Sequence, residues 1–466
     1  MRALLKTVPL LLALFAAPPH AFAETRLSSG LAESQLSFNF ARCIAVGEGR
    51  SVHVVWFDSQ IRYRRSIDDG RSWLAPVTLS APDGRSEQAA IAVAGRAVYV
   101  AWHELRGTLP QIVFRRSLDG GATWEPEQRL TDASIHSAHP SIAATGARVH
   151  VTWFDGRHGE VLPEIYTRHS RDGGATWQQE QRISESNAPS WVSTIEANGL
   201  DVFIGWVDYL DANEEEYLRR SVDGGETWLP AVRMTSDPAD SWAPSIALSG
   251  RAVHFAWFDR RHAEATDVDM ELKLNEALTL VGLPASPPPP RTPENYYLNA
   301  FAERIQTKKQ QLIQVLPQWV AMGGDPKKVE AILRDYERLE QAWSEGWEIY
   351  TKRSADGGES FGADTRLTFA AGASNRPSIF VRGDDVGVVW FDFRDHASEI
   401  YAKFSSDGGA TWSGDVRLTS SGAAVLASAA RSSEALHVVW RDSRLPTAQV
   451  YYSRIPLAGK RRAARP

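Results

Sequence analysis

Four apolar segments of the chain end in an aspartate that is followed two residues later by an arginine. The pairs are Asp155 with Arg157, Asp259 with Arg261, Asp392 with Arg394, and Asp442 with Arg444. A guanidinium binds a carboxylate through two parallel hydrogen bonds, so these arginines are candidates to bind an acidic ligand. The same recurrence also fits a salt bridge between repeated structural units.

Other residues break the repeated pattern, and function is expected at such positions. Arg42, His139 and Arg376 stand at comparable places, where the first apolar segment of a repeat begins. Trp191 and Trp242 precede the first segments of two adjacent repeats, and aromatic faces line many sugar-binding sites. Packing against neighbouring residues is the alternative role of both tryptophans. These five residues join the four arginines as ligand-binding candidates.

An eight-residue motif recurs along the chain and is clearest at Ser117–Trp124, which reads SLDGGATW. Its aspartate can accept hydrogen bonds from its own turn, and its glycines tolerate positive φ. Five related copies begin at Ser66, Ser170, Ser221, Ser354 and Ser405. The copy at Ser66 resembles part of a calcium-binding loop, but most copies offer one carboxylate, too few oxygen ligands for Ca²⁺. The motif is therefore predicted to be a structural turn without a metal.

The aspartates of this motif recur every 51 to 53 residues, apart from one longer interval between Asp223 and Asp356. A tryptophan that ends an apolar segment keeps the same spacing at seven places: Trp56, Trp102, Trp153, Trp206, Trp257, Trp390 and Trp440. A period of this length indicates a repeat architecture built from one small sheet per copy. The motif is the Asp box, and a chain with six copies resembles the sialidase-like β-propellers.

Seven tryptophan-ended strands and six Asp boxes favour seven blades, with six blades as the alternative. The segment Glu24–Ser28 resembles the strand that ends each repeat, such as Glu127–Thr131, and the last repeat lacks such a strand. The N-terminal segment is therefore predicted to complete the C-terminal blade and close the ring. The predicted fold is an all-β, seven-bladed β-propeller with an inserted α-helical hairpin.

The longer interval is assigned to an insertion over residues 265–345, between propeller segments at 24–264 and 346–457. A proline-rich spacer precedes two predicted helices, and Asp325 with Pro326 marks the start of the second. A lid over the channel, a docking surface, a dimer contact and a self-packed decoration are the open roles of this hairpin. A basic tail over residues 458–466 follows the last blade.

The resemblance to sialidases implies a particular set of catalytic residues. Those enzymes use a tyrosine nucleophile activated by a glutamate, together with an aspartate acid/base, and depart from the usual pair of carboxylates. By residue type, Tyr209, Asp211, Glu214 and Glu104 are the catalytic candidates. The Arg-Ile-Pro element of the family occurs only at Arg454–Pro456, in the last blade and not before the first Asp box. The resemblance is thus specific for the fold and weak for catalysis.

Composition limits the classes of partner. The 466-residue chain has a net charge of −6 with both signs dispersed, which argues against a nucleic-acid surface. Cys43 is the only cysteine, so neither an intrachain disulfide nor a cysteine metal cluster can form. Residues 1–23 have the basic start, short apolar run and small-residue cleavage site of a signal peptide. A secreted or periplasmic protein without a membrane span is predicted, cut near Ala23.

The sequence leaves two functions open. The first is an exported sialidase-type glycoside hydrolase that acts on acidic glycans and needs no cofactor. The second is a non-catalytic propeller or scaffold that binds a glycan or a protein at its channel face, with the helical insertion as docking element. Propellers host many unrelated sites, so the geometry of the site has to decide between the two.

Overall fold

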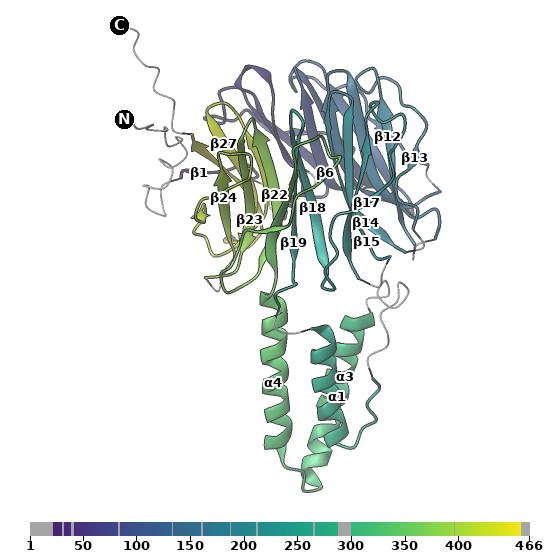
Figure 1. The fold of residues 1–466 in the computed structure, drawn as a ribbon, viewed down its shortest axis with the longest axis vertical. Coiled ribbons are helices and arrows are strands. Elements are labelled where there is room, and N and C mark those ends of the chain that lie inside the picture. Colours follow the sequence, from purple (N-terminus) through teal and green to yellow (C-terminus); the bar gives the residue numbers. More distant parts are fainter. Residues whose placement is uncertain are drawn as a thin grey trace, which may run out of the picture.

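Seven four-stranded sheets form the blades of a single β-propeller, from which the helices α1, α3 and α4 project (Figure 1). The computed structural model describes residues 22–29, 32–38, 42–82, 84–132, 134–159, 162–186, 188–210, 213–263, 266–287, 300–395 and 397–457. Within these helices, the side chains of residues 267, 300–303 and 343 are not described. The predicted seven-bladed, nearly all-β fold with a helical insertion is confirmed.

The first four blades take their strands in chain order. They are β2 (Ile44–Val46), β3 (Val52–Phe57), β4 (Ile61–Ser66) and β5 (Val77–Thr78); β6 (Arg85–Ala94), β7 (Ala97–Leu105), β8 (Pro110–Ser117) and β9 (Gln128–Arg129); β10 (Ser137–Thr145), β11 (Arg148–Asp155), β12 (Glu164–Ser170) and β13 (Gln181–Arg182); β14 (Ser190–Asn198), β15 (Asp201–Asp208), β16 (Glu215–Ser221) and β17 (Val232–Arg233).

The remaining three blades follow the same plan, except that the N-terminal strand supplies the fourth strand of the last blade. They are β18 (Ser241–Ser249), β19 (Ala252–Asp259), β20 (Glu348–Ser354) and β21 (Thr365–Arg366); β22 (Ser374–Arg382), β23 (Asp385–Asp392), β24 (Glu399–Ser405) and β25 (Val416–Arg417); β26 (Ala424–Arg431), β27 (Ala435–Asp442) and β28 (Gln449–Pro456), with β1 (Glu24–Arg26) as the fourth strand.

The second strand of each blade is the most buried because it lies between two neighbouring sheets. In β11, every residue from Val149 to Asp155 is buried. The indole of Trp153 donates a hydrogen bond to Asp155 at 2.9 Å. The same bond recurs at Trp206, Trp257, Trp390 and Trp440. The repeated Trp-x-Asp spacing therefore records a polar contact that satisfies a buried indole.

The carboxylate of each Asp box accepts hydrogen bonds from residues of its own turn. Asp119 accepts hydrogen bonds from the amides of Ala122 and Thr123 at 2.9 Å and from the Thr123 hydroxyl at 2.6 Å. These donors, led by Thr123, hold the pKa of Asp119 well below its ordinary value. The ring of Trp124 packs edge-on against Tyr63 of the preceding blade, with centroids 4.8 Å apart. Each box thus closes a turn and also joins two blades.

The N-terminal strand closes the ring as the sequence predicts. β1 pairs antiparallel with β28, with Glu24 opposite Ser453. Leu27 is buried, and its amide donates to the carbonyl of Val450 at 2.8 Å. Arg444 pairs with Glu24 at 2.6 Å, so a residue from the start of the chain completes the polar network of the last blade.

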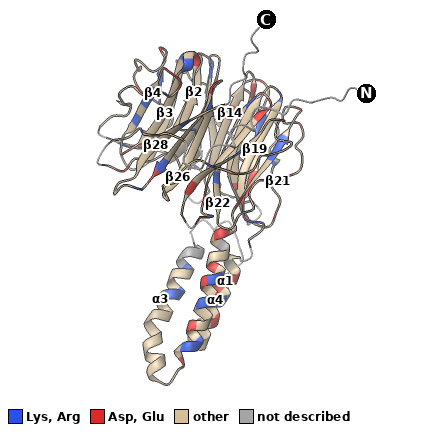
Figure 2. Ribbon diagram, turned by 90° about the vertical axis from the view of Figure 1, so that its left-hand side faces the viewer, with Lys and Arg blue, Asp and Glu red and all other residues tan. Residues whose placement is uncertain are grey.

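In its described residues, the insertion between β19 and β20 contains α1 (Asp267–Leu280), α3 (Ala300–Ala321) and α4 (Pro326–Glu345). The sequence predicted α3 and α4 but not α1, which begins with a capping box between Thr266 and Asp269. Helix α1 packs against both α3 and α4. These helices, named the arm, project away from one side of the propeller (Figures 1 and 2).

The arm has a core of its own, separate from the seven blade interfaces. Met270, Leu274 and Leu312 lie in one apolar cluster made only of arm residues. Glu271, which is 1% exposed, pairs there with Arg304 at 2.9 Å and with Lys308 at 3.2 Å. Burying these charges is tolerated because they satisfy one another.

Replacing residues 266–345 by a short Gly/Ser loop is expected to leave the propeller folded, because the arm buries its apolar side chains internally. The thermal unfolding midpoint of the shortened protein should stay within a few degrees of the full chain in a calorimetric scan. A loss of cooperative unfolding would show instead that the arm is part of the propeller core.

Three sequence predictions fall wholly or largely outside the described residues. They concern the signal peptide, the basic tail and the catalytic candidate Asp211. In the part of the chain that the structure does describe, no helix combines the length and the apolar character needed to cross a membrane.

Candidate functional site

Six blades share an irregular inner strand. In five of them a serine at the start of the strand donates to the carboxylate that ends the second strand, as Ser374 does to Asp392 at 2.8 Å. The register then shifts at a β-bulge, and the residue two positions after the strand's start adopts a left-handed backbone. These residues, named the bulge ring, have φ between 47° and 70°: Gln88, His139, Val192, Ala243, Arg376 and Leu426.

The bulge ring combines a repeated backbone with side chains that differ from blade to blade. Positive φ is uncommon outside glycine and especially unfavourable for the β-branched Val192. Strained positions of this kind cluster at functional sites. In blade 5, Trp242 pairs with Phe258 just before the arm leaves the sheet, so the ring lies near the channel face that carries the arm. This mouth of the channel is the candidate site.

The segment Leu36–Phe38 is held by bulge residues of two well-separated blades. Gln88 of blade 2 accepts hydrogen bonds from the Phe38 amide at 2.7 Å and from the Ser37 hydroxyl at 3.1 Å. Arg376 of blade 6 donates to the Phe38 carbonyl at 3.0 Å. Since blades 2 and 6 grip the same segment, it crosses the channel mouth. The Phe38 ring is 40% exposed there.

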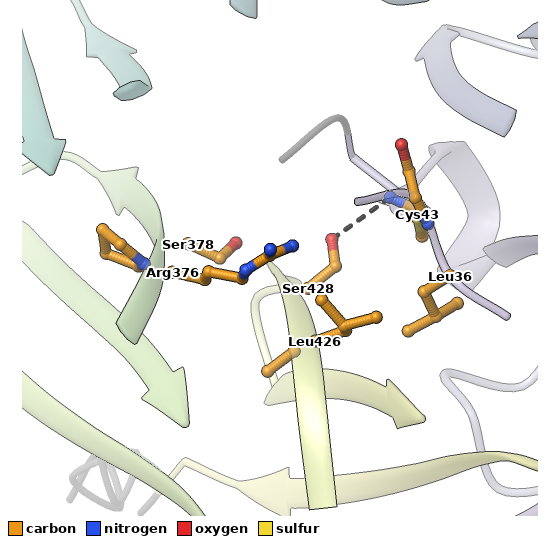
Figure 3. A pocket seen from close by; sticks show the side chains of 9 residues that line it. Leu36, Cys43, Arg376, Ser378, Leu426 and Ser428 are labelled. Carbon is orange, nitrogen blue, oxygen red and sulfur yellow. Dashed lines mark hydrogen bonds between the residues drawn. The ribbon is translucent and has the colours of Figure 1, made fainter. Parts of the chain in front are cut away.

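A small pocket opens beside this segment (Figure 3). It is lined by Leu36, Ser37, Cys43, Arg376, Pro377, Ser378, Leu426, Ala427 and Ser428. The Arg376 side chain extends towards Ser428, whose hydroxyl accepts a hydrogen bond from the Cys43 amide at 3.2 Å. Burial lowers the pKa of Arg376 to about 10, which leaves the guanidinium charged at neutral pH. Burial raises the pKa of the Cys43 thiol to about 12, so that thiol is no nucleophile at neutral pH.

A row of rings crosses blades 2 to 4 at the same mouth. His103 and His139 have centroids 5.4 Å apart, His139 and Phe154 are 5.2 Å apart, and Phe154 and Trp191 are 5.5 Å apart. Burial lowers the pKa of His139 to about 3, so its ring is neutral. Beside the row, a hydrogen bond with His103 is the main cause that lowers the pKa of Glu87 to about 2. The row offers aromatic faces, of which the His139 ring is neutral, with the ionised Glu87 carboxylate at one end.

Arg42 forms an ion pair with a residue of another blade. From blade 1 its guanidinium pairs with Glu196 of blade 4 at 2.5 Å and donates to the Ile246 carbonyl of blade 5 at 3.2 Å. Burial raises the pKa of Glu196, and the charge of Arg42 acts against that rise. The Arg42 side chain is 40% exposed, and its role in ligand binding stays a prediction.

Residues 48–254 match a family described as a BNR repeat-like domain. Among solved structures, an ulvan lyase bound to a GlcA–Rha3S unit has a TM-score of 0.53 and 9% identity, over 92% of this chain and 95% of that chain. An α-L-arabinofuranosidase of Fusarium graminearum has a TM-score of 0.42 and 13% identity, over 81% of this chain and 95% of that chain. A sialidase of Trypanosoma rangeli has a TM-score of 0.43 and 9% identity, over 94% of this chain and 59% of that chain. No curated protein sequence matches the chain.

The chain is a seven-bladed β-propeller with a BNR repeat-like segment. At these identities the solved structures establish only that the fold is shared.

The four Asp-x-Arg arginines lie in four different blades. Arg157 is bound by Asp155 at 2.7 Å and by Glu180, the residue before β13, and its guanidinium lies 4.0 Å over the Tyr166 ring. The same arrangement recurs at Arg261, Arg394 and Arg444. Each arginine thus ties three strands within one blade. The ion pairs that the structure shows for these arginines lie within a blade, whereas the clamp for an acidic ligand stays a prediction.

The described catalytic candidates are buried and lie in two different blades. Glu104 accepts a hydrogen bond from Ser86 at 2.9 Å and pairs with Arg106 at 2.6 Å, so it takes the place of the repeat aspartate in blade 2. Tyr209 and Glu214 are 1% and 2% exposed in blade 4. The structure does not bring the three residues together at the channel mouth.

The off-repeat aromatic candidates do reach the mouth. Trp191 is half-buried against Phe154, and Trp242 is half-buried against the apolar core between blades 5 and 6. His139 and Arg376 belong to the bulge ring itself. Sequence reasoning missed Gln88, although its place two residues after Ser86, the serine equivalent to Ser374, would have identified it.

Proposed function

We propose that this propeller binds an acidic glycan at the mouth of its central channel. The observation that carries the proposal is the bulge ring, in which six blades keep a strained backbone while the side chain changes. Strain of this kind is retained where the surrounding structure fixes it and commonly serves a site. The proposal therefore places recognition on the residues that differ around the ring.

The chemistry at the mouth fits sugar rings that carry an anionic group. Arg376 offers a buried cation next to the Ser378 and Ser428 hydroxyls, a set of donors suited to a carboxylate or a sulfate. The row from His103 to Trp191 offers aromatic faces for sugar rings. Arg376 is in blade 6 and the row is in blades 2 to 4, so the ligand is an oligosaccharide that reaches across the mouth.

Binding without cleavage is favoured over hydrolysis. A tyrosine nucleophile needs contact with the substrate, and Tyr209 is buried with only 1% of its surface exposed. The arginines expected to hold a substrate carboxylate are occupied within their own blades. Sialidase-type hydrolysis is accordingly the alternative that the binding experiment also tests.

Arg376→Ala is expected to weaken binding of acidic oligosaccharides by about 10- to 100-fold, because a charge-assisted hydrogen bond contributes about 1.5–3 kcal/mol. Affinities for a panel of uronic acid, sulfated and sialylated oligosaccharides and their neutral counterparts would be measured by calorimetry. Neutral oligosaccharides should lose much less affinity. Trp191→Ala should weaken both classes.

The matched control is Arg382→Ala, which removes an exposed arginine from the far end of the same strand. Its affinities should equal those of the unchanged protein. Equal affinities for Arg376→Ala and Arg382→Ala would overturn the proposed site. Turnover of a fluorogenic sialoside that Tyr209→Phe abolishes would favour the hydrolase instead.

A further inference from the structure

The interface between blades 4 and 5 differs from the other six in one buried residue. At the third-strand position whose carbonyl accepts a hydrogen bond from the fourth strand or the residue after it, six blades carry a branched aliphatic residue that packs in the apolar cluster shared with the next blade. These residues are Ile61, Ile112, Ile165, Ile349, Ile400 and Val450. Blade 4 carries Glu216 at this position, opposite Val207 in the register.

The strand around Glu216 keeps the geometry of the repeat. Its amide donates to the Thr235 hydroxyl at 2.9 Å, and its carbonyl accepts from the Met234 amide at 2.7 Å. Ile349 makes the equivalent bonds with Thr368 and Leu367 in blade 5. The glutamate side chain therefore enters the blade interface where isoleucine enters it elsewhere.

The carboxyl group of Glu216 is enclosed without a partner. The residue is 0% exposed, and neither carboxyl oxygen has a hydrogen-bond partner among the described residues. Burial raises the pKa of Glu216 well above its ordinary value, and the charges of Glu215, Glu214 and Asp259 raise it further. An ionised carboxylate without compensation is among the costliest groups to bury, so the packed interface holds the neutral acid.

Among the described residues, the charged groups around Glu216 are carboxylates and arginines that pair with other carboxylates. On its own strand and the preceding loop lie Glu215 and Glu214, and the neighbouring strand β15 ends in Asp208, whose pKa burial also raises. Blade 5 contributes Asp259 and the buried pair of Asp240 with Arg260. The nearby arginines are already paired: Arg233 with Glu215, Arg260 with Asp240, and Arg261 with Asp259.

We propose that the interface between blades 4 and 5 is a proton-dependent joint, packed while Glu216 is protonated and hydrated once the proton leaves. The joint lies at the root of the arm. Arg260 is buried against Asp240 and lies 5.3 Å over the ring of Trp347, the second residue after α4 ends. Loss of packing between these blades therefore affects the residues that connect the arm to the propeller.

The direction of the pH dependence follows from the raised pKa. Folding favours the protonated form, so the interface is most stable below the ordinary pKa of glutamate. Its stability falls as the pH rises towards the raised value, and the opening equilibrium changes by up to tenfold per pH unit in that range. The other six interfaces lack such a group at this position, so the opening is local.

Amide hydrogen exchange of the full-length protein tests the joint. Between about pH 5 and about pH 9, after correction for intrinsic exchange, protection of β16, β18 and β19 should fall by at least tenfold. Protection of β7 and β8 in blade 2 should stay constant as the internal reference. In Glu216→Ile, the protection of all these strands should be independent of pH.

Two further variants distinguish the effect of the proton on hydrogen exchange from the effect of the side chain's shape. Glu216→Gln keeps the shape without a titrating group and should show no pH dependence. Ile165→Glu places an acid at the equivalent position of blade 3 and should transfer the pH-dependent exchange to the interface between blades 3 and 4. Equal pH profiles for the unchanged protein and Glu216→Ile would overturn the proposal, even if Ile165→Glu fails to fold.

Discussion

A chain that begins at residue 29 is expected to be at least about 5 kcal/mol less stable than one that begins at Phe22, because it lacks the strand that closes the ring. The loss includes the ladder between β1 and β28, the buried side chain of Leu27 and the ion pair of Glu24 with Arg444. Each hydrogen bond contributes about 1 kcal/mol and a buried leucine about 1.5–3 kcal/mol. Denaturant unfolding of both chains would measure the difference.

The exposed edge of β28 gives a second readout. An unpaired strand edge is a template for association, so the shortened protein should elute as oligomers or aggregates in size-exclusion chromatography. Replacing Glu24–Ser28 by five Gly/Ser residues keeps the length and should reproduce both defects. Arg26→Ala, at an exposed position of the same strand, should not. Unchanged stability after removal of the strand would contradict its role in closure.

Much of the fold could be predicted because its signals are local and repeated. The Asp box fixes a turn through its own side chain, and the tryptophan two residues before an aspartate satisfies its indole within one strand. In blade 3, the third strand, Glu164–Ser170, ends at the serine that begins the Asp box. Helix α1 was not predicted, although Thr266 and Asp269 form a capping box at its start.

The candidate site was harder to predict because it depends on which side chains meet across the ring. His139 and Arg376 were predicted as ligand-binding residues because they depart from the repeat. The structure places both in the bulge ring. The Asp-x-Arg pairs looked like a clamp because their second carboxylate, such as Glu180, lies on another strand. Arg42 looked available because its partner Glu196 is in blade 4, three blades away. Spacing along one repeat carries no information on such contacts.

Asp69 also departs from the repeat, within the first Asp box. In five Asp boxes this position is glycine, and the left-handed backbone there costs an aspartate more. Asp69 nevertheless has φ 63° and is 1% exposed. It pairs with Arg454 of blade 7 at 2.5 Å and lies 3.3 Å from His437. The strained aspartate thus joins the first and last blades on the Asp-box side of the ring.

Asp69→Ala is expected to cost about 3 kcal/mol of unfolding free energy, because it leaves Arg454 without its buried carboxylate. Burial alone would raise the pKa of Asp69, but Arg454, Ser432 and His437 outweigh it and lower the pKa. A lowered folded-state pKa means that this stability is present above the ordinary pKa of aspartate and is lost as the pH falls. Denaturant unfolding at several pH values would show the difference between the two proteins shrinking in acid.

A double-mutant cycle with Arg454→Met distinguishes a specific pair from general damage to the blade. If Asp69 acts through Arg454, the second substitution should add little to the first, and the coupling should exceed about 1 kcal/mol. Asp119→Ala is the contrasting case, because that carboxylate holds only its own turn and should not couple to Arg454. Additive losses for Asp69 and Arg454 would mean that β1 alone closes the ring.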